Sequence, residues 1–469
     1  MALMARVVAG TVAAALVVAG GYAWADAHDI VPGVLTLGPE PAPAAPFPNA
    51  PAAIPGPEPQ DTLSVLDATA PIPTPATVQA AVDALVADPR MGTSTGVVVA
   101  DALTGQVLAS ASPEIPRVPA SIQKLLTAAA ALDALGDDRV LTTTVTQSSP
   151  GTITLVGGGD MMLAAGSGDP DAVNGHAGLD DLAAQVAKEL SLAGRVSVSL
   201  TLDDSLFTGS ATGGWAEDIP GLGYAAPVAA LGVDTGRMAA GEYAPRHGDP
   251  AMVAAEAFVA ALAAHGVSVE GAPTRGTTSP DARVLGSVDS APMGEIVEYF
   301  LHTSDNTITE VVGRLVALEV GLPGSFEGAT TAVLTEISSL GVDVSGAVMT
   351  DCSGLADGSR LTATTILEVL DLLNDPAHPQ LRAAAVSLPV AGLDGTLSDR
   401  FLSTQGRGVV RAKTGSLPHV TSLAGTALTA DNRQLTFVVM ADQTPDGGQW
   451  GPRQAMDDFV SSLAACGCS

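Results

Sequence analysis

The chain contains almost no lysine, few aromatic residues and little positive charge of any kind. Three of its 469 residues are lysine, 3% are aromatic, and 20 Lys and Arg residues stand against 50 Asp and Glu, for a net charge of −30 at pH 7. Because nucleic acids and anionic membrane surfaces bind clustered basic residues, this balance argues against both as partners. The hydrophobic content of 46% is nevertheless ample for a packed core.

Cysteine is also scarce, because Cys352 stands alone and only Cys466 and Cys468 accompany it at the end of the chain. These positions lack the paired spacing of zinc sites, so we expect neither a metal nor a cofactor. Such sparse cysteines fit an oxidising compartment and leave two interpretations open. Cys352 forms a disulfide with one of the terminal pair, which would tether the tail to the core, or it stays a free thiol.

The N-terminus has the pattern of an export signal. Arg6 precedes an uncharged, largely apolar run over residues 7–25, which ends in the A-x-A cleavage pattern Ala23-Trp24-Ala25. The run is also long enough to span a bilayer, so residues 1–25 are predicted to be a signal peptide or a membrane anchor. Either one predicts an exported, extracytoplasmic protein, in the cell envelope or secreted. Residues 26–75, rich in proline and alanine, are expected to form an extended linker.

Beyond the linker, the alternation of short apolar runs with helical patterns predicts an α/β fold. Strands are expected at 96–100, 106–110, 141–146, 152–156, 196–202, 409–411, 422–429 and 434–440. Helices are expected at 76–85, 120–135, 179–192, 250–265, 304–319 and 452–465. The stretch 137–290 differs in character from its flanks. We therefore predict one catalytic domain, formed by residues 76–136 and 291–469 with an antiparallel sheet and helices, split by a β-rich insertion at 137–290.

Two of the three lysines stand in motifs with catalytic potential. Ser121 and Lys124 form an S-x-x-K tetrad, and their spacing places both side chains on one face of a helix near its start. A lysine removed from water loses its proton readily, which arginine does not, and a neutral Lys124 could take the proton of the Ser121 hydroxyl. Alone the tetrad is a weak signal, because serine is also a common helix N-cap.

Two further motifs follow along the chain. Ser304-Asp305-Asn306 lies at the predicted start of a helix, where Ser304 could relay a proton and Asn306 could bind a substrate amide. Lys413-Thr414-Gly415-Ser416 follows a predicted strand. Lys413 and Thr414 would bind a substrate carboxylate, and Gly415 would let a substrate backbone approach closely.

The order S-x-x-K, S-x-N, K-T-G is a strong joint signal, since this set marks penicillin-binding proteins and β-lactamases. The chain resembles the low-molecular-mass class C penicillin-binding proteins, which are D-alanyl-D-alanine carboxypeptidases and endopeptidases. The resemblance runs from about residue 80 to 465. Ser304 lies 183 positions after Ser121, a long separation that is typical of this family because it inserts domains there. The matching segments are 119–127, 156–160, 203–207, 226–234, 388–397 and 410–416.

The resemblance implies an acyl-serine peptidase acting on peptidoglycan stem peptides, with β-lactam antibiotics as covalent inhibitors. Ser121 would be the nucleophile and Lys124 its base, while Ser304 and Lys413 would assist protonation of the leaving amine. The resemblance also implies an oxyanion hole formed by the backbone N–H groups of Ser121 and Ser416, a kind of site that often contributes several kcal/mol to catalysis.

One segment departs from the family pattern, and two other functions stay open. Where the family commonly has D-G-S-G-L-S-R, this chain has Asp351-Cys-Ser-Gly-Leu-Ala-Asp357, with Arg360 three residues on, so specificity for the diamino acid of the stem peptide is in doubt. A serine β-lactamase is one alternative, although no Glu-x-x-Leu-Asn element lies between Ser304 and Lys413. A catalytically silent wall-binding scaffold is the other.

Overall fold

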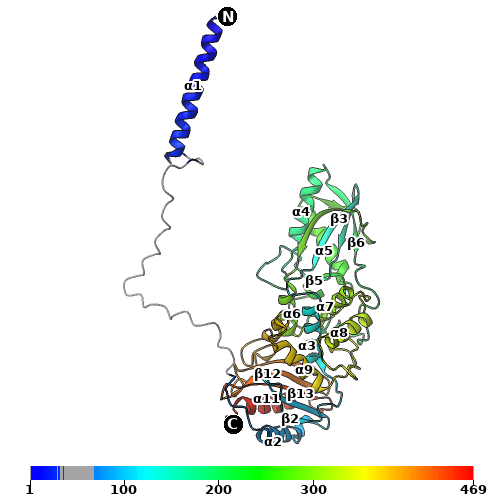
Figure 1. The fold of residues 1–469 in the computed structure, drawn as a ribbon. Coiled ribbons are helices and arrows are strands. Elements are labelled where there is room, and N and C mark those ends of the chain that lie inside the picture. Colours follow the sequence, from blue (N-terminus) through cyan, green and yellow to red (C-terminus); the bar gives the residue numbers. More distant parts are fainter. Residues whose placement is uncertain (1, 29, 32–34, 36–67, 468–469) are drawn as a thin grey trace. The chain divides into compact units, whose positions relative to one another are not determined.

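A computed structural model describes residues 2–28, 30–31, 35 and 68–467 (Figure 1). The chain divides into two compact units, Met1–Ser64 and Val65–Ser469. In the first, helix α1 covers Ala2–Ala27. The predicted linker falls mostly outside the described residues. No helix within the described part of the chain is both long and apolar enough to cross a membrane.

A five-stranded antiparallel sheet forms the base of the second unit, in the order β11-β12-β13-β1-β2. Its strands are β1 (Thr95–Asp101), β2 (Val107–Ala111), β11 (Val410–Leu417), β12 (Val420–Leu428) and β13 (Gln434–Ala441). Strand side chains alternate between faces, so Val97 and Val99 enter one core while Val98 and Ala100 enter another. Both faces are therefore buried, which explains why β1 is buried along its whole length and apolar from Gly96 to Ala100.

Two helices cover one face of this sheet, and a larger helical layer covers the other. The first pair is α2 (Pro75–Val86) and α11 (Trp450–Ala464), which pack on each other and on the sheet. The larger layer comprises α3 (Lys124–Ala134), α6 (Met293–Thr303), α7 (Asn306–Glu319), α8 (Phe326–Ser339), α9 (Ala363–Asn374) and α10 (Arg382–Val386). Small alanines let α3 lie at its centre, where residues 124–132 are all buried.

The segment between α3 and α6 forms a second sheet, at the opposite end of the helical layer from the first (Figure 1). Its strands are β3 (Thr142–Ser149), β4 (Thr152–Val156), β6 (Ser197–Asp203), β8 (Ser268–Val269), β9 (Thr274–Arg275) and β10 (Arg283–Asp289). The order is β10-β3-β4-β6-β8, with β9 also on β6. Helices α4 (Leu179–Leu192) and α5 (Pro250–Ala264) share its apolar core.

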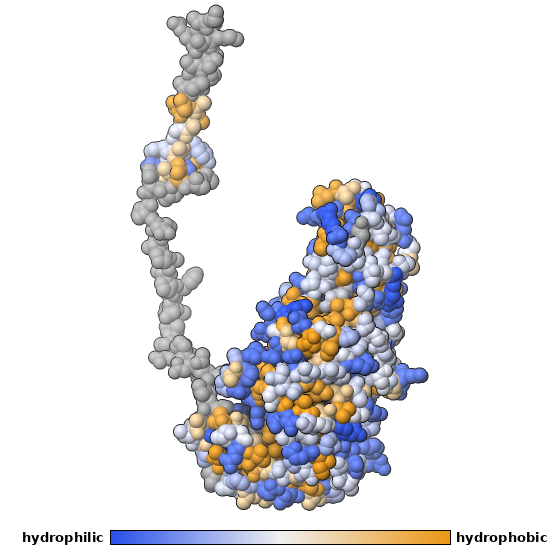
Figure 2. All heavy atoms as spheres, turned by 45° about the vertical axis from the view of Figure 1, so that its right-hand side comes forward, coloured by the Kyte–Doolittle hydropathy of each residue, from blue (hydrophilic) through white to orange (hydrophobic). Residues whose placement is uncertain are grey.

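Strands β5 (Asp160–Leu163) and β7 (Leu231–Val233) pair in parallel in a small separate sheet. The mixed α/β fold confirms the predicted fold class. The predicted domain boundaries stay a prediction. The sheet of β10, β3, β4, β6 and β8 begins at Thr142 and ends at Asp289, within the predicted insertion at 137–290. Figure 2 shows an apolar patch at the upper end of the second unit. Among the exposed large apolar side chains are Leu192, the last residue of α4, and Val196, which follows that helix.

Candidate active site

Ser121 lies in a tight passage between two glycines. It belongs to a short 3-10 turn, η2 (Ala120–Gln123), which leads directly into α3. A Cβ on Gly354 would lie 2.1 Å from the Ala120 carbonyl oxygen, and one on Gly415 would lie 3.0 Å from the Ser121 nitrogen. Ala120 itself has φ of 49°, a conformation that is costly for a residue with a side chain. The packing on both sides therefore fixes the backbone that presents Ser121.

Lys124 points its amine at Ser121 from the first turn of α3. Its Nζ donates to Ser121 Oγ at 3.0 Å, to Asn306 Oδ1 at 2.7 Å and to the Ser353 carbonyl oxygen at 2.9 Å. The side chain is fully buried. Burial lowers the pKa of Lys124 to about 8, against the opposing pull of nearby carboxylates. The amine can therefore lose its proton near neutral pH while staying aimed at the hydroxyl.

Ser304 and Asn306 lie where α6 ends and α7 begins. Ser304 has φ of 60° and lies outside both helices, so the prediction that a helix runs from residue 304 is wrong at its start. The left-handed turn lets Asp305 cap α7 by accepting from the Ile308 N–H at 2.9 Å. Asn306, at the first position of α7, donates from Nδ2 to the Tyr224 carbonyl oxygen at 2.9 Å. One sharp turn thus aims two polar side chains at the site.

Lys413 reaches the same turn from β11, the edge strand of the base sheet. Its Nζ donates to Ser304 Oγ at 2.9 Å and to the Thr414 carbonyl oxygen at 3.0 Å. The side chain is fully buried, and burial holds the pKa of Lys413 well below its usual range, with the charge of Lys124 lowering it further. Lys413 and Ser304 therefore form a second amine–hydroxyl pair beside Lys124 and Ser121.

The remaining predicted residues line β11. A Cβ on Gly415 would lie 2.1 Å from Ser422 Oγ, so only glycine fits where the strand crosses the serine turn. Thr414 Oγ1 donates to Thr396 Oγ1 at 3.0 Å, and Ser416 Oγ accepts from Arg453 Nη2 at 3.1 Å. The structure brings all eight predicted site residues into one region.

Two buried acids, Glu310 and Asp351, lie close to Lys124, and the sequence motifs assign a role to neither of them. Glu310, one turn after Asn306 on α7, accepts from the Ser353 N–H at 2.7 Å and from the Cys352 N–H at 3.0 Å. Asp351 accepts from the Gly354 N–H at 2.8 Å. Burial, and after it the nearby charge of Asp351, raises the pKa of Glu310 to about 8. Together they fix the loop whose carbonyl holds Lys124.

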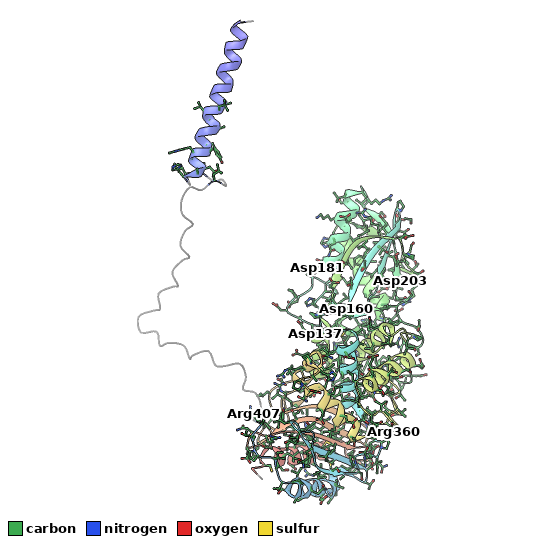
Figure 3. All side chains as sticks on the ribbon, in the orientation of Figure 1. Asp137, Asp160, Asp181, Asp203, Arg360 and Arg407 are labelled. Carbon is green, nitrogen blue, oxygen red and sulfur yellow. The ribbon has the colours of Figure 1, made fainter. Side chains whose placement is uncertain are left out.

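In the loop that departs from the family pattern, Asp357 stands where the family commonly has arginine. Asp357 is exposed and lines a cavity of about 440 Å³ together with Glu327. Arg360, labelled in Figure 3, is also exposed, and its Nη1 donates to the carbonyl oxygen of its neighbour Ser359 at 2.8 Å. At the position where the family pattern has arginine, this loop therefore presents the carboxylate of Asp357.

Cys352 is a free, buried thiol. Of the two interpretations that the sequence left open for Cys352, the free thiol is therefore correct and the disulfide to the terminal pair is wrong. Cys466 is disulfide-bonded without it. A Cβ on Gly313 of α7 would lie 2.3 Å from the Cys352 sulfur, which is packed against that helix and shielded from water. Burial also raises the pKa of the thiol, so Cys352 is a packing residue of the loop.

Comparison with known proteins agrees with this geometry. A model of the D-Ala-D-Ala carboxypeptidase 3 (S13) family matches residues 78–257 and 243–463. A carboxypeptidase named DacB from Mycolicibacterium smegmatis is 38% identical over 100% of this chain and 96% of its own length. A D-alanyl-D-alanine carboxypeptidase from an Actinomadura species is 31% identical over 73% of this chain and 77% of its own length.

The fold has solved counterparts as well. The crystal structure of penicillin-binding protein 4 from Haemophilus influenzae superposes with a TM-score of 0.70 at 22% identity, over 82% of this chain and 99% of that one. A second is a peptidoglycan endopeptidase from Bdellovibrio bacteriovorus, with a TM-score of 0.50 at 16% identity, over 79% of this chain and 92% of its own. At these identities the likeness concerns the fold.

Proposed function

The chain belongs to the D-Ala-D-Ala carboxypeptidase 3 (S13) family and is a serine-type D-Ala-D-Ala carboxypeptidase, and from that premise we propose how its residues carry out the reaction. Ser121 Oγ attacks the carbonyl of the penultimate D-Ala while Lys124 Nζ takes the hydroxyl proton. The observation that carries this proposal is the 3.0 Å contact from a fully buried lysine to the serine hydroxyl. Such an amine–hydroxyl pair is the arrangement of an activated nucleophile.

The second pair, Ser304 and Lys413, acts on the leaving group. When the tetrahedral intermediate collapses, the C–N bond breaks and the amine of the terminal D-Ala needs a proton. Ser304 Oγ supplies that proton and regains one from the ammonium of Lys124, relayed through Lys413, whose Nζ lies 2.9 Å from Ser304 Oγ. Lys124 is neutral again after this step. Ser121 is left as an acyl ester. Water then attacks that ester while neutral Lys124 accepts a proton from it. As the C–O bond to Ser121 breaks, this proton passes to Ser121 Oγ, and the shortened peptide leaves as a carboxylic acid.

The substrate lies along β11 in this proposal. As the edge strand of the sheet, β11 has backbone groups facing away from β12, and an extended peptide can pair with them. The N–H groups of Ser121 and Ser416 would stabilise the oxyanion, since Gly415 brings the two segments into contact. The substrates are the D-Ala-D-Ala ends of peptidoglycan stem peptides or D-Ala cross-links between them, and β-lactams acylate Ser121.

Peptidoglycan lies outside the cytoplasm, so the enzyme is exported. The apolar segment over residues 7–25, with its A-x-A end, is the candidate signal or anchor. The negative net charge agrees with a wall-directed enzyme that binds neither nucleic acid nor an anionic lipid surface.

The proposal is tested by incubating residues 68–469 and their Ser121→Ala variant with benzylpenicillin and recording intact mass over time. We expect one long-lived adduct on the unsubstituted protein and none on the variant, together with release of D-Ala from a stem pentapeptide by the former only. An adduct that disappears within seconds with released product would favour a β-lactamase. No adduct and no turnover on folded protein would favour a silent scaffold.

A further inference from the structure

The exposed aromatic rings of the second unit lie around the catalytic residues. Among the described residues 68–467, the exposed Phe, Tyr and Trp side chains are Tyr224, Tyr243 and Trp450, with exposed fractions of 44%, 61% and 72%. Only 3% of the chain is aromatic, so three such rings near one site call for an explanation. Apolar side chains that gather on a surface mark a binding site, whereas scattered ones need no explanation.

Tyr224 and Tyr243 come from the inserted segment and lie beside the S-x-N turn. The Tyr224 carbonyl oxygen accepts from Asn306 Nδ2 at 2.9 Å. The Tyr243 ring packs edge-on against that of Tyr224, with 5.6 Å between the ring centroids. Buried Arg246 donates to the carbonyl oxygens of the residues that precede the two tyrosines, at 3.1 and 3.3 Å. The backbone therefore holds both rings in place at the edge of the site.

Trp450 belongs to the catalytic part of the chain, at the first turn of α11. The residue before it, Gln449, donates from Nε2 to the Leu417 carbonyl oxygen at 2.7 Å, so α11 begins beside the end of β11. Arg453 follows three residues later, and side chains with this spacing lie on one face of a helix. Arg453 Nη2 donates to Ser416 Oγ at 3.1 Å, so the face that carries Trp450 is turned towards β11.

Arg453 also connects the two aromatic sides. Partial burial and a hydrogen bond to the neighbouring glutamate raise the pKa of Tyr243 to about 12, and the charge of Arg453 opposes this rise. The phenol and the guanidinium are therefore within electrostatic range of each other. Arg453 in turn contacts Ser416, the neighbour of the glycine that packs against the Ser121 turn. Tyr243 and Trp450 therefore border the end of β11 that lies beyond Ser121.

The stem peptide is long enough to bring a sugar to these rings. Its terminal carboxylate is expected beside Lys413 and Thr414, so the stem runs along β11 towards Leu417. Four residues of a pentapeptide precede the cleaved bond and extend over up to about 13 Å. From Gly415, at the serine, the strand rises by only about 7 Å to its end at Leu417. The N-terminus of the stem, which is joined to the amino sugars of the glycan strand, therefore passes the end of β11, where Trp450 lies.

We propose that Trp450 and Tyr243 bind the amino-sugar rings of the glycan strand, so that the enzyme prefers stem peptides attached to glycan over free peptides. A pyranose ring has a flat face of C–H groups and a rim of hydroxyl and amide groups. The face fits the indole and phenol rings, and the rim meets the Arg453 guanidinium and the Tyr243 hydroxyl. This inference rests on the proposed function, because the stem that Ser121 cleaves brings the glycan to the rings.

Two substrates with the same stem test the proposal on the full-length enzyme. One is an N-acetylated stem pentapeptide, and the other is the same pentapeptide joined to its disaccharide of N-acetylated amino sugars. The unsubstituted enzyme should release D-Ala from the glycopeptide with the higher kcat/KM, through a lower KM. Trp450→Ala should lower kcat/KM for the glycopeptide by about five- to tenfold, since aromatic contacts contribute on this scale. The acetylated peptide should be hydrolysed within about twofold of the unsubstituted rate, which also verifies folding of the variant.

Matched variants complete the design. Trp450→Phe should recover part of the preference, because it keeps an aromatic ring, and Tyr243→Ala should reduce the preference without affecting the acetylated peptide. Leu192→Ala, which truncates an exposed apolar side chain at the end of α4, should leave both substrates unaffected.

Equal kcat/KM for the two substrates in the unsubstituted enzyme, or equal losses on both in Trp450→Ala, would overturn the proposal. A dimer of the full chain that Trp450→Ala dissociates, with the preference unchanged, would overturn it as well and assign the ring to a second copy. If the unsubstituted enzyme released D-Ala from neither substrate, the proposed function would fail, and this inference with it.

Discussion

The two lysines of the site are equally buried but have different neighbours. Lys124 lies within the field of Asp351, Glu310 and Asp305, which hold its pKa near about 8 against the effect of burial. The amine of Lys413 bonds to a hydroxyl and a carbonyl instead, and its pKa is held well below the usual range. Carboxylates raise the pKa of Lys124, whereas none counteracts the effect of burial on the pKa of Lys413. The two amines therefore lose their protons at different pH.

This difference fits a division of labour within one cycle. A group that must accept a proton and give it back works best with a pKa near the working pH, which describes Lys124. A group that stays neutral can pass protons along a hydrogen-bonded pair, which describes Lys413 with Ser304. The rarity of lysine in the chain suggests that both positions need an amine and not merely a positive charge.

The largest effect is expected from replacing Lys124. Lys124→Ala and Lys124→Arg should each lower acylation by benzylpenicillin and hydrolysis of peptide and thioester by about 10²–10⁴-fold, the usual contribution of a general base. Arginine should not rescue, because it keeps its proton. Stopped-flow or mass-resolved acylation rates measure this, with Lys188→Ala as the exposed-lysine control. An active Lys124→Arg variant would contradict a proton-accepting role.

Replacing Lys413 should separate the two lysines by substrate. An amine leaving group needs a proton and a thiolate does not, so Lys413→Ala should lower peptide hydrolysis by about 10²-fold and thioester hydrolysis by much less. Parallel kcat/KM measurements on an acyl-D-Ala-D-Ala peptide and the matching thioester acid test this, again against Lys188→Ala. Equal losses on both substrates would assign Lys413 to binding alone.

A substitution at Glu310 should change the pKa of Lys124 while Lys124 itself is kept. Glu310→Gln keeps an oxygen for the Cys352 and Ser353 N–H groups but removes a carboxyl group whose ionised form raises the pKa of Lys124. The acylation rate should then rise at lower pH than in the unsubstituted enzyme, with a similar plateau. Glu310→Ala also frees the loop and should lower the plateau about tenfold. A shift of the profile to higher pH in Glu310→Gln would contradict the electrostatic role of Glu310.

The smallest catalytic effect is expected at Arg237, which links the inserted segment to the S-D-N turn. Its Nη2 lies 3.4 Å from Asp305 Oδ2, and the Asp305 side chain is almost fully buried. Arg237→Gln should lower the free energy of unfolding by about 1–3 kcal/mol, because it removes a bond to a buried acid. Activity should fall no more than a few-fold. Urea unfolding and peptide hydrolysis measure the two effects, and an unchanged stability would show that the pair is dispensable.

The sequence predicts the nucleophile and the lysines because rare residues and a fixed motif order reveal them. The strand predicted at 409–411 is longer in the structure, where β11 continues through the K-T-G-S motif. The sequence does not reveal Glu310, which looks like one more polar residue on an amphipathic helix. Nor does the sequence predict that the Ser353 carbonyl oxygen accepts a hydrogen bond from Lys124, because every residue has a carbonyl group. The sequence pattern places Ser304 at the start of a helix. In the structure a left-handed turn separates it from α7, and that turn depends on how α6 and α7 pack.

Other misses have the same origin in long-range packing. Helices α6, α8 and α9 were not predicted, although their apolar spacing resembles that of helices that were. The contact of Arg453 with Ser416 joins a helix and a strand that are 37 positions apart in the sequence. The local sequence pattern of neither segment predicts it. The sequence left the state of Cys352 open because the oxidising compartment indicates that disulfides form but not which cysteines are close.

The central claim, that neutral Lys124 activates Ser121, is tested most directly by the pH dependence of acylation. The rate of benzylpenicillin adduct formation would be followed by intact mass from about pH 6 to about pH 10 on the unsubstituted enzyme. Because the pKa of Lys124 is lowered to about 8, the neutral amine accumulates as pH rises through that value, so the rate should increase and then level off. A rate independent of pH, or one that falls across this range, would contradict the claim.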